Sequence, residues 1–294
     1  MKLVCAVCTS ILLAMLLNSA PAAAQDVPKD YQEVLTFLGR TGDFKAKVLK
    51  VNVPRNDLKV TIAGQSTPTP FGFGGWVAMT KGDTGGEVLM GDLVLTQEEV
   101  NPVMSALLEH GIEVTALHNH FFFEEPRLFY MHVHGHGEAM DLARSIKPAL
   151  DLIPKPPAAP SAAPAAPAFN LVALDKIVGQ QGESLGSVYK FTLGRDDLNL
   201  KEHGAPINAR MGLNSWAAFA GNNGDAQIAG DIAMRESEVN GVLKALRSHK
   251  LNVVAIHHHM LGTQPTVIFL HYWGRGPAEE LAAGFRAALD ILGK

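Results

Sequence analysis

The chain carries one sequence pattern twice, and this duplication limits its folds more than any other feature. Equivalent segments follow the same order in both copies at a nearly constant offset, which indicates a tandem repeat of one domain. The matched segments include Trp76-Val77-Ala78 with Trp216-Ala217-Ala218, Gly91-Asp92-Leu93 with Gly230-Asp231-Ile232, and Ala116-Leu117-His118-Asn119-His120 with Ala255-Ile256-His257-His258-His259. We therefore expect two copies of the same fold.

A stretch of proline, alanine, lysine and serine from Pro154 to Pro167 separates the copies. Such a composition favours an extended, semi-rigid spacer. We predict a first repeat domain at residues 25–152, a linker at 153–169 and a second repeat domain at 170–294. Cleavage within the linker is expected to leave two folded halves, because a linker contributes to neither core. The same linker also permits the two domains to dock face to face as a pseudo-dimer.

Residues 1–24 have the pattern of a cleavable signal peptide. Lys2 precedes an apolar run from Leu3 to Leu17, and Ala22-Ala23-Ala24 forms a small-residue cleavage site. The run is shorter than the ~20 residues of a spanning helix, so we expect a periplasmic or secreted protein with no stable membrane anchor after cleavage. Both cysteines lie in this leader, which leaves the mature chain without disulfides or thiolate ligands.

Charge and motifs exclude several function classes. The net charge is −4 and basic residues form no dense stripe, so a nucleic-acid partner is not expected, although His118-Asn119-His120 spells the name of a nuclease class. The chain contains no G-x-S-x-G, P-loop or H-E-x-x-H string, which removes the usual support for serine hydrolases, nucleotide binders and zincins. A small-molecule or cell-envelope ligand remains as the expected partner.

The periodicity of each copy predicts an α+β fold, namely an antiparallel sheet with helices packed on one face. In the first copy, a helix is expected from Thr96 to Gly111, with Glu99 completing a capping box and Val100, Val103, Leu107 and Leu108 forming its apolar stripe. Glu99 and its equivalent Glu238 are therefore interpreted as caps rather than ligands. Further helices are expected at 31–38, 137–150 and 171–178, and strands at 48–53, 58–63, 75–80, 87–95, 112–120 and 128–134.

Histidines recur at the same spacing in both copies. On a strand, residues two apart point to one face, and a hairpin brings the faces of two strands side by side. Neutral imidazole is a common ligand of divalent transition metals, and three histidines can form an open site. We therefore predict metal ligation, with zinc the first choice, while hydrogen-bonded core or surface histidines remain the alternative. The predicted ligands are His118, His120 and His132 in the first copy and His257, His259 and His271 in the second.

Other polar residues near these histidines have more than one interpretation. Glu125 is proposed as general base, and Arg127 is placed to hold an anionic group. Asp92 and Asp231 fit either site residues or turn formers. Trp76 and Trp216 fit core packing or, less simply, stacking on a ligand.

The first copy resembles the LppY/LpqO family of bacterial exported proteins and lipoproteins through the series His118-Asn119-His120, Glu125-Pro126-Arg127 and Met131-His132. The second copy shares Leu213 to Phe219, His257 to Leu261 and His271 to Gly274 with it. It departs where Asn119, Glu125 and Arg127 become His258, Gln264 and Thr266, which favours the first copy as the active one. The resemblance implies an exported protein and no particular reaction.

The leading hypothesis is a metal-dependent hydrolase that acts on a cell-envelope or small-molecule substrate. A non-catalytic periplasmic ligand-binding module is the competing hypothesis. A structural envelope protein comes third.

Overall fold

The fold is α+β, as predicted, with antiparallel sheets in two similar halves. A computed structural model describes residues 26–83, 85–155 and 165–293. The predicted signal peptide lies outside the described residues, as does most of the predicted linker. None of the described helices is long and apolar enough to cross a bilayer.

Within residues 26–83 and 85–155, the first half combines a six-stranded sheet with three helices. The helices are α1 (Lys29–Leu38), α2 (Gln97–Glu109) and α3 (Ala139–Asp151). The sheet has the order β1-β2-β5-β6-β9-β7, formed by β1 (Gly42–Lys45), β2 (Val48–Pro54), β5 (Gly74–Lys81), β6 (Glu87–Thr96), β9 (Leu128–Gly137) and β7 (Glu113–His118). A small second sheet joins β4 (Gln65–Thr67), β3 (Val60–Ile62) and β8 (Glu124–Glu125), and η1 (Thr69–Phe71) follows β4.

The second half repeats the six-stranded sheet and its helices, but within residues 165–293 its small second sheet has only the two strands β12 and β13. Its helices are α4 (Leu171–Val178), α5 (Val239–Ser248) and α6 (Ala278–Leu289). Its sheet has the order β10-β11-β14-β15-β17-β16, formed by β10 (Glu183–Leu185), β11 (Val188–Gly194), β14 (Asn214–Gly221), β15 (Ala226–Arg235), β17 (Val267–Gly276) and β16 (Asn252–His257). The short elements are η2 (Asp196–Leu198), β12 (Lys201–Glu202), β13 (Ala205–Pro206), η3 (Ala209–Met211) and η4 (Glu236–Glu238).

The capping box at the start of α2 is confirmed, because the Thr96 backbone donates to the Glu99 carboxylate at 2.8 Å. Glu99 also forms an ion pair with Arg55 at 2.6 Å, and Glu238 forms the equivalent pair with Arg195 at 3.1 Å. These contacts give both glutamates a structural role. The predicted burial of Leu108 is wrong: the residue is 57% exposed, because the helix turns only part of its apolar stripe toward the sheet.

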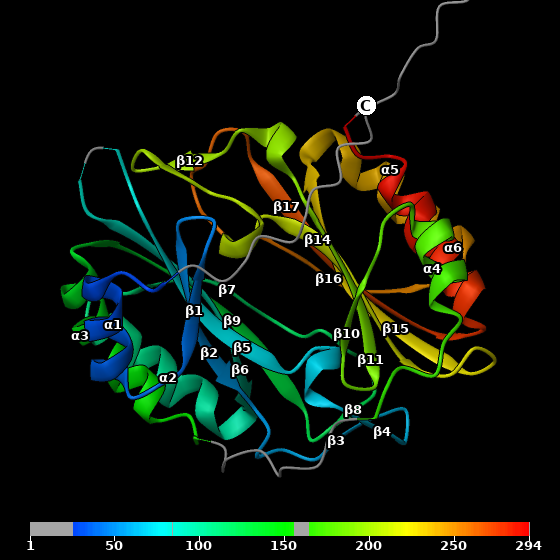
Figure 1. The fold of residues 1–294 in the computed structure, drawn as a ribbon, viewed down its shortest axis with the longest axis horizontal. Coiled ribbons are helices and arrows are strands. Elements are labelled where there is room, and N and C mark those ends of the chain that lie inside the picture. The colour runs from blue at the N-terminus through cyan, green and yellow to red at the C-terminus, as the bar shows by residue number, and fades with distance from the viewer. Residues whose placement is uncertain (1–25, 84, 156–164, 294) are drawn as a thin grey trace, which may run out of the picture.

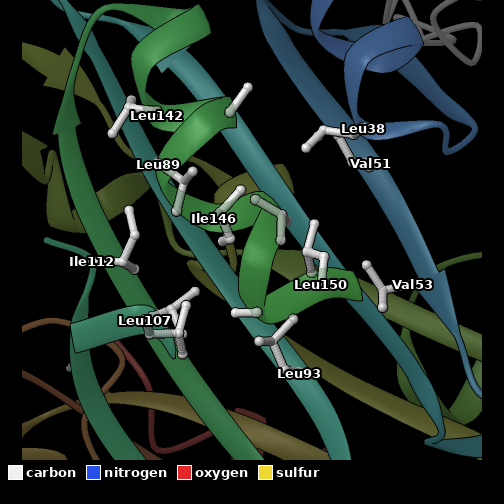
Figure 2. Packing of buried hydrophobic residues seen from close by; sticks show 14 of the residues in the cluster. Leu38, Val51, Val53, Leu89, Leu93, Leu107, Ile112, Leu142, Ile146 and Leu150 are labelled. Atoms are coloured by element: carbon white, nitrogen blue, oxygen red, sulfur yellow. The ribbon is translucent and has the colours of Figure 1, made fainter. Parts of the chain in front are cut away.

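Alternation along the strands gives each sheet two different apolar faces. In the first half, one face packs against the helices around residues such as Leu89, Leu93 and Ile146 (Figure 2). The opposite face packs against the sheet of the other half, so the layers run helices, sheet, sheet, helices (Figure 1). Two clusters of buried residues contain side chains from both halves, for example Met90 with Phe269 and Tyr130 with Ala218.

The shared clusters change what is expected of the linker. Cleavage within residues 156–164 should leave two fragments that remain bound to each other, because separation would expose the apolar face of both sheets to water. Size-exclusion chromatography of the nicked protein should show one peak with both fragments, and thermal unfolding should show one transition. Two separately eluting folded fragments would restore the expectation of independent domains.

Candidate metal centre

The six predicted histidines occupy equivalent places in the two halves. His118 ends β7 and His257 ends β16, whereas His120 and His259 lie two residues beyond these strands. His132 on β9 and His271 on β17 alternate with residues that face the helices, so their side chains face the opposite sheet. The strand predicted at 112–120 ends at His118 in the structure, so His120 lies outside it.

The histidines of the two halves meet at the interface between the sheets. The ring centroids of His118 and His257 are 3.7 Å apart. Those of His120 and His271 are 3.6 Å apart, and those of His132 and His259 are 3.8 Å apart. The structure thus brings all six into one cluster rather than one site per copy, because the sheet faces that carry them pack against each other.

Two groups within this cluster have the geometry to hold a metal ion. His118, His257 and His271 form one group, and His132, His257 and His259 form the other. In each group the candidate ligand atoms lie within 4.8 Å of one another. Each group draws on both copies, and His257 belongs to both, while His120 belongs to neither.

The hydrogen bonds of the histidines suit metal ligation. The Nδ1 atom of His132 lies 3.3 Å from the Gly91 carbonyl oxygen, and that of His271 lies 3.2 Å from the Gly230 carbonyl oxygen. Since a carbonyl only accepts, Nδ1 carries the proton and the lone pair of Nε2 is available for a metal. Both Nε2 atoms are buried and find no hydrogen-bond partner among the described residues.

Burial keeps these imidazoles neutral. Desolvation lowers the pKa of His257 to about 4 and the pKa values of His259 and His271 to about 3. It also lowers the pKa values of His120 and His132 well below the usual range, with charge repulsion from neighbouring histidines as the second cause. The neutral form is the one that ligates metals, so the cluster is ready for an ion at neutral pH.

Two aspartates lie beside the histidines in the middle of strands. Asp92 pairs across β6 and β9 with His132, and Asp231 pairs in the same register with His271. The Asp231 Oδ2 atom is 3.4 Å from His259 Nε2. Burial, followed by the charge of Asp231, raises the pKa of Asp92 to about 7. Of the two interpretations of these aspartates, the structure supports site residues, because neither lies in a turn.

The expected catalytic pair is not brought to the histidines. β8 pairs with β3, which leaves the Glu125 side chain exposed while its neighbour Glu124 is buried. Arg127 is also exposed, with its Nε atom 3.9 Å from Glu124 Oε1. Neither Glu125 nor Arg127 contacts a cluster histidine within the part of the chain that the structure describes.

A cavity of about 650 Å³ adjoins the cluster and is lined by both halves. Its wall includes His120, His259 and His271 together with both aspartates. Trp76 and Trp216 line it as well, so these tryptophans are more than core residues. One member of each metal-capable group, His271 in one and His259 in the other, therefore lines a space of the size that small ligands occupy.

A family model described as a Domain of Unknown Function (DUF1259) matches residues 32–152 and 172–291. The chain belongs to this family. Each half of the structure is one DUF1259 domain, so the histidine cluster forms between two domains of the same kind. No curated protein matches the sequence.

Three solved structures show remote similarity to the DUF1259 chain. EtuB from Clostridium kluyveri is 9% identical over 86% of this chain and 89% of its own, with a TM-score of 0.22. The trimeric bacterial microcompartment shell protein PduB is 11% identical over 83% and 88%, with a TM-score of 0.19. The double-ringed trimeric shell protein MSM0271 from the RMM microcompartment is 11% identical over 70% and 81%, with a TM-score of 0.17. Scores this low carry no argument about fold or function.

Each DUF1259 copy also stacks an aromatic ring on its second histidine. Tyr130 stacks on His120 at a centroid distance of 3.2 Å, and Phe269 stacks on His259 at 3.4 Å. Tyr130 and Phe269 occupy equivalent strand positions, two residues before His132 and His271. These rings restrict the orientation of the imidazoles. The sequence did not predict this role of Tyr130 and Phe269, because stacking depends on the strand register.

Proposed function

We propose that this is an exported protein whose two DUF1259 domains hold a divalent metal ion, zinc, between their sheets. The convergence of buried imidazole nitrogens from both domains carries the proposal, since most of them have no hydrogen-bond partner among the described residues. A buried nitrogen without a partner costs stability, and ligation to a metal would satisfy it. Export rests on the leader sequence, and the resemblance to LppY/LpqO proteins supports it.

The donor set fits zinc. Each metal-capable group offers three neutral nitrogens and no thiolate, a combination that zinc accepts when a fourth position is left for water or substrate. A zinc ion held there would supply Lewis-acid activation of water at neutral pH. We therefore propose hydrolysis of a small molecule or a cell-envelope component as the reaction.

The residues proposed to assist differ from those expected at first. Asp92 and Asp231 line the cavity and lie beside the histidines, so they replace Glu125 as the proposed acid-base groups. Asp231 accepts a hydrogen bond from the backbone of Leu270 at 3.0 Å, which fixes its carboxylate. Asp92 Oδ1 has no partner among the described residues and is placed to hold a proton.

Ligand binding without catalysis is the second candidate, and the size of the cavity favours it. The two functions separate in a hydrolysis assay of the zinc-loaded protein with 4-nitrophenyl acetate and 4-nitrophenyl phosphate. Zinc-dependent turnover supports the hydrolase. Bound zinc with no turnover of either ester supports the binding module.

The metal proposal predicts bound zinc in the purified mature protein and a lower melting temperature after chelation. At a thousandfold excess over the dissociation constant, a bound ligand contributes about 4 kcal/mol, or about 10 °C for a protein of this size. Elemental analysis and melting curves with and without chelator measure the two effects. A protein without transition metal that also melts unchanged in chelator, even after incubation with zinc, contradicts the proposal.

A further inference from the structure

The cavity beside the histidine cluster is also lined by two lysines, which lie on other strands than the histidines. Lys50 lies on β2 and Lys190 on β11, and two strands separate each of them from the histidine-bearing β9 or β17. We propose that this part of the cavity binds the acidic group of a small oxyanion-bearing molecule, a carboxylate or a phosphate, through Lys50, Lys190 and Arg210. The inference deepens the proposed function by naming a ligand class, and it rests on the metal only for the reaction.

Both lysines are positioned but have no acceptor for their protons. The Nζ atom of Lys50 lies 4.3 Å from the ring centroid of Trp76, and that of Lys190 lies 4.3 Å from the ring centroid of Trp216. Within the described structure, neither ammonium has a hydrogen bond or an ion pair. The tryptophans hold the ammonium groups in place by cation–π contact, and the N–H donors stay available for a ligand.

Arg210 adds a donor from η3 of the second half. Its Nη2 atom donates to Asp43 Oδ1 of the first half at 2.7 Å, which anchors the guanidinium across the interface. Its Nε atom is buried and has no partner among the described residues. A planar guanidinium fixed at one end and open at another is suited to an oxyanion.

The electrostatics of this region favour an anion. Burial, then the charges of Lys190 and Arg210, lowers the pKa of Lys50 to about 7, although Asp92 and Asp43 act in the opposite direction. Burial lowers the pKa of Lys190 to about 8, although the charges of Glu183 and Asp92, which also line the cavity, act in the opposite direction. An oxyanion between these groups would relieve the repulsion and restore their protonation, so binding above neutral pH should take up protons.

The same geometry sets the size and orientation of the ligand. A volume of about 650 Å³ suits a small molecule rather than a polymer. An acidic group held by the lysines leaves the remaining part of the molecule to extend toward the aspartates and histidines of the same cavity. The lysines would thus act as binding residues, and the proposed metal centre would face the reacting part.

The test is isothermal titration calorimetry of the full chain with succinate in one arm and inorganic phosphate in the other. Zinc-loaded and chelator-treated protein are compared for the wild type, Lys50→Met and Lys190→Met, with Lys244→Met as a matched change at an exposed site on α5. We expect one of the two anions to bind, and each cavity substitution to weaken it at least tenfold, because a hydrogen bond to a charged group is lost. Lys244→Met should bind like the wild type.

Proton uptake gives a second readout. At pH 8, heats measured in two buffers of different ionisation enthalpy should reveal uptake by the wild type and less by Lys50→Met. Absence of binding by both anions, or binding that both cavity substitutions leave unchanged, overturns the anion site. Binding that is lost when zinc is removed, but that neither lysine substitution weakens, overturns the anion site and leaves the metal proposal standing. Lysine-dependent binding by a protein that holds no zinc supports the anion site and contradicts the metal proposal.

Discussion

A single His257→Ala substitution is expected to remove metal binding by the whole chain, although the substituted residue lies in the second copy only. His257 belongs to both metal-capable groups, so the substitution leaves only two histidines in each. Loss of an outer-sphere partner already costs 10–100-fold in metal affinity, so loss of a direct ligand should cost at least about 100-fold. Zinc titration against a fluorescent chelator, with elemental analysis of the dialysed protein, measures the loss.

Two other substitutions make this result specific. His110 lies in the first copy and is exposed, and its Nδ1 atom contacts the Ala106 carbonyl oxygen, so His110→Ala should bind zinc normally. His118→Ala should have a smaller effect than His257→Ala, because the group of His132, His257 and His259 stays complete. If His257→Ala instead retained the metal held by the first copy with unchanged affinity, each domain would have its own site.

Local sequence signals were sufficient for much of the fold. Thr96 and Glu99 specify the start of α2 through a capping box, and alternating residues such as Met131 and Val133 identify β9 and its buried face. The short β1 and β4 were not predicted, because three or four residues carry too little periodicity. The repeated pattern required the second half to have the same topology.

The site was only partly predictable because it depends on register and docking. The spacing of His118 and His132 indicated a shared face within one copy, but no periodicity reports which surface covers that face. The row of Trp76, Asp92 and His132 across β5, β6 and β9 follows from strand register, which sequence alone does not provide. Glu125 was misplaced in the expected site because β8 pairs with β3 rather than with the histidine-bearing strands.

The polar interior of this interface requires a physical reason. Apolar side chains flank the cluster on both sides, and replacing the histidines by such residues would avoid the cost of buried nitrogens without partners. Six imidazoles at equivalent positions of two domains, with the aspartates in the same rows, are therefore better explained by a function than by packing. The stability of the metal-free protein should show this cost directly.

Metal-free protein is expected to lose stability steeply between about pH 6.5 and pH 4. The unfolded histidines titrate near ~6.5, whereas the folded pKa of His257 is about 4 and those of His259 and His271 are about 3. At pH values below the pKa of the unfolded histidines, the unfolded chain binds more protons than the folded chain. The stabilisation is therefore fully present above that pKa and is lost as the pH falls below it. Each buried histidine contributes up to about 1.4 kcal/mol per pH unit to the slope of the unfolding free energy. The raised pKa of Asp92 has the opposite effect and cancels the contribution of about one of the six histidines.

Even half of that slope would remove several kcal/mol per pH unit, which is comparable to the ~5–15 kcal/mol that stabilises a folded domain. Urea unfolding of chelator-treated protein at pH 7.5, 6.5, 5.5 and 4.5 gives the slope directly. His120→Gln should reduce the slope by about one histidine while leaving both metal-capable groups complete, and His110→Gln should leave it unchanged. Zinc should raise the stability by a similar amount at each of these pH values without changing the slope, because the folded histidines are already neutral there. A stability that stays constant from pH 7.5 to pH 4.5 would mean that the histidines are hydrated and charged in the folded protein, and the buried cluster would then be excluded.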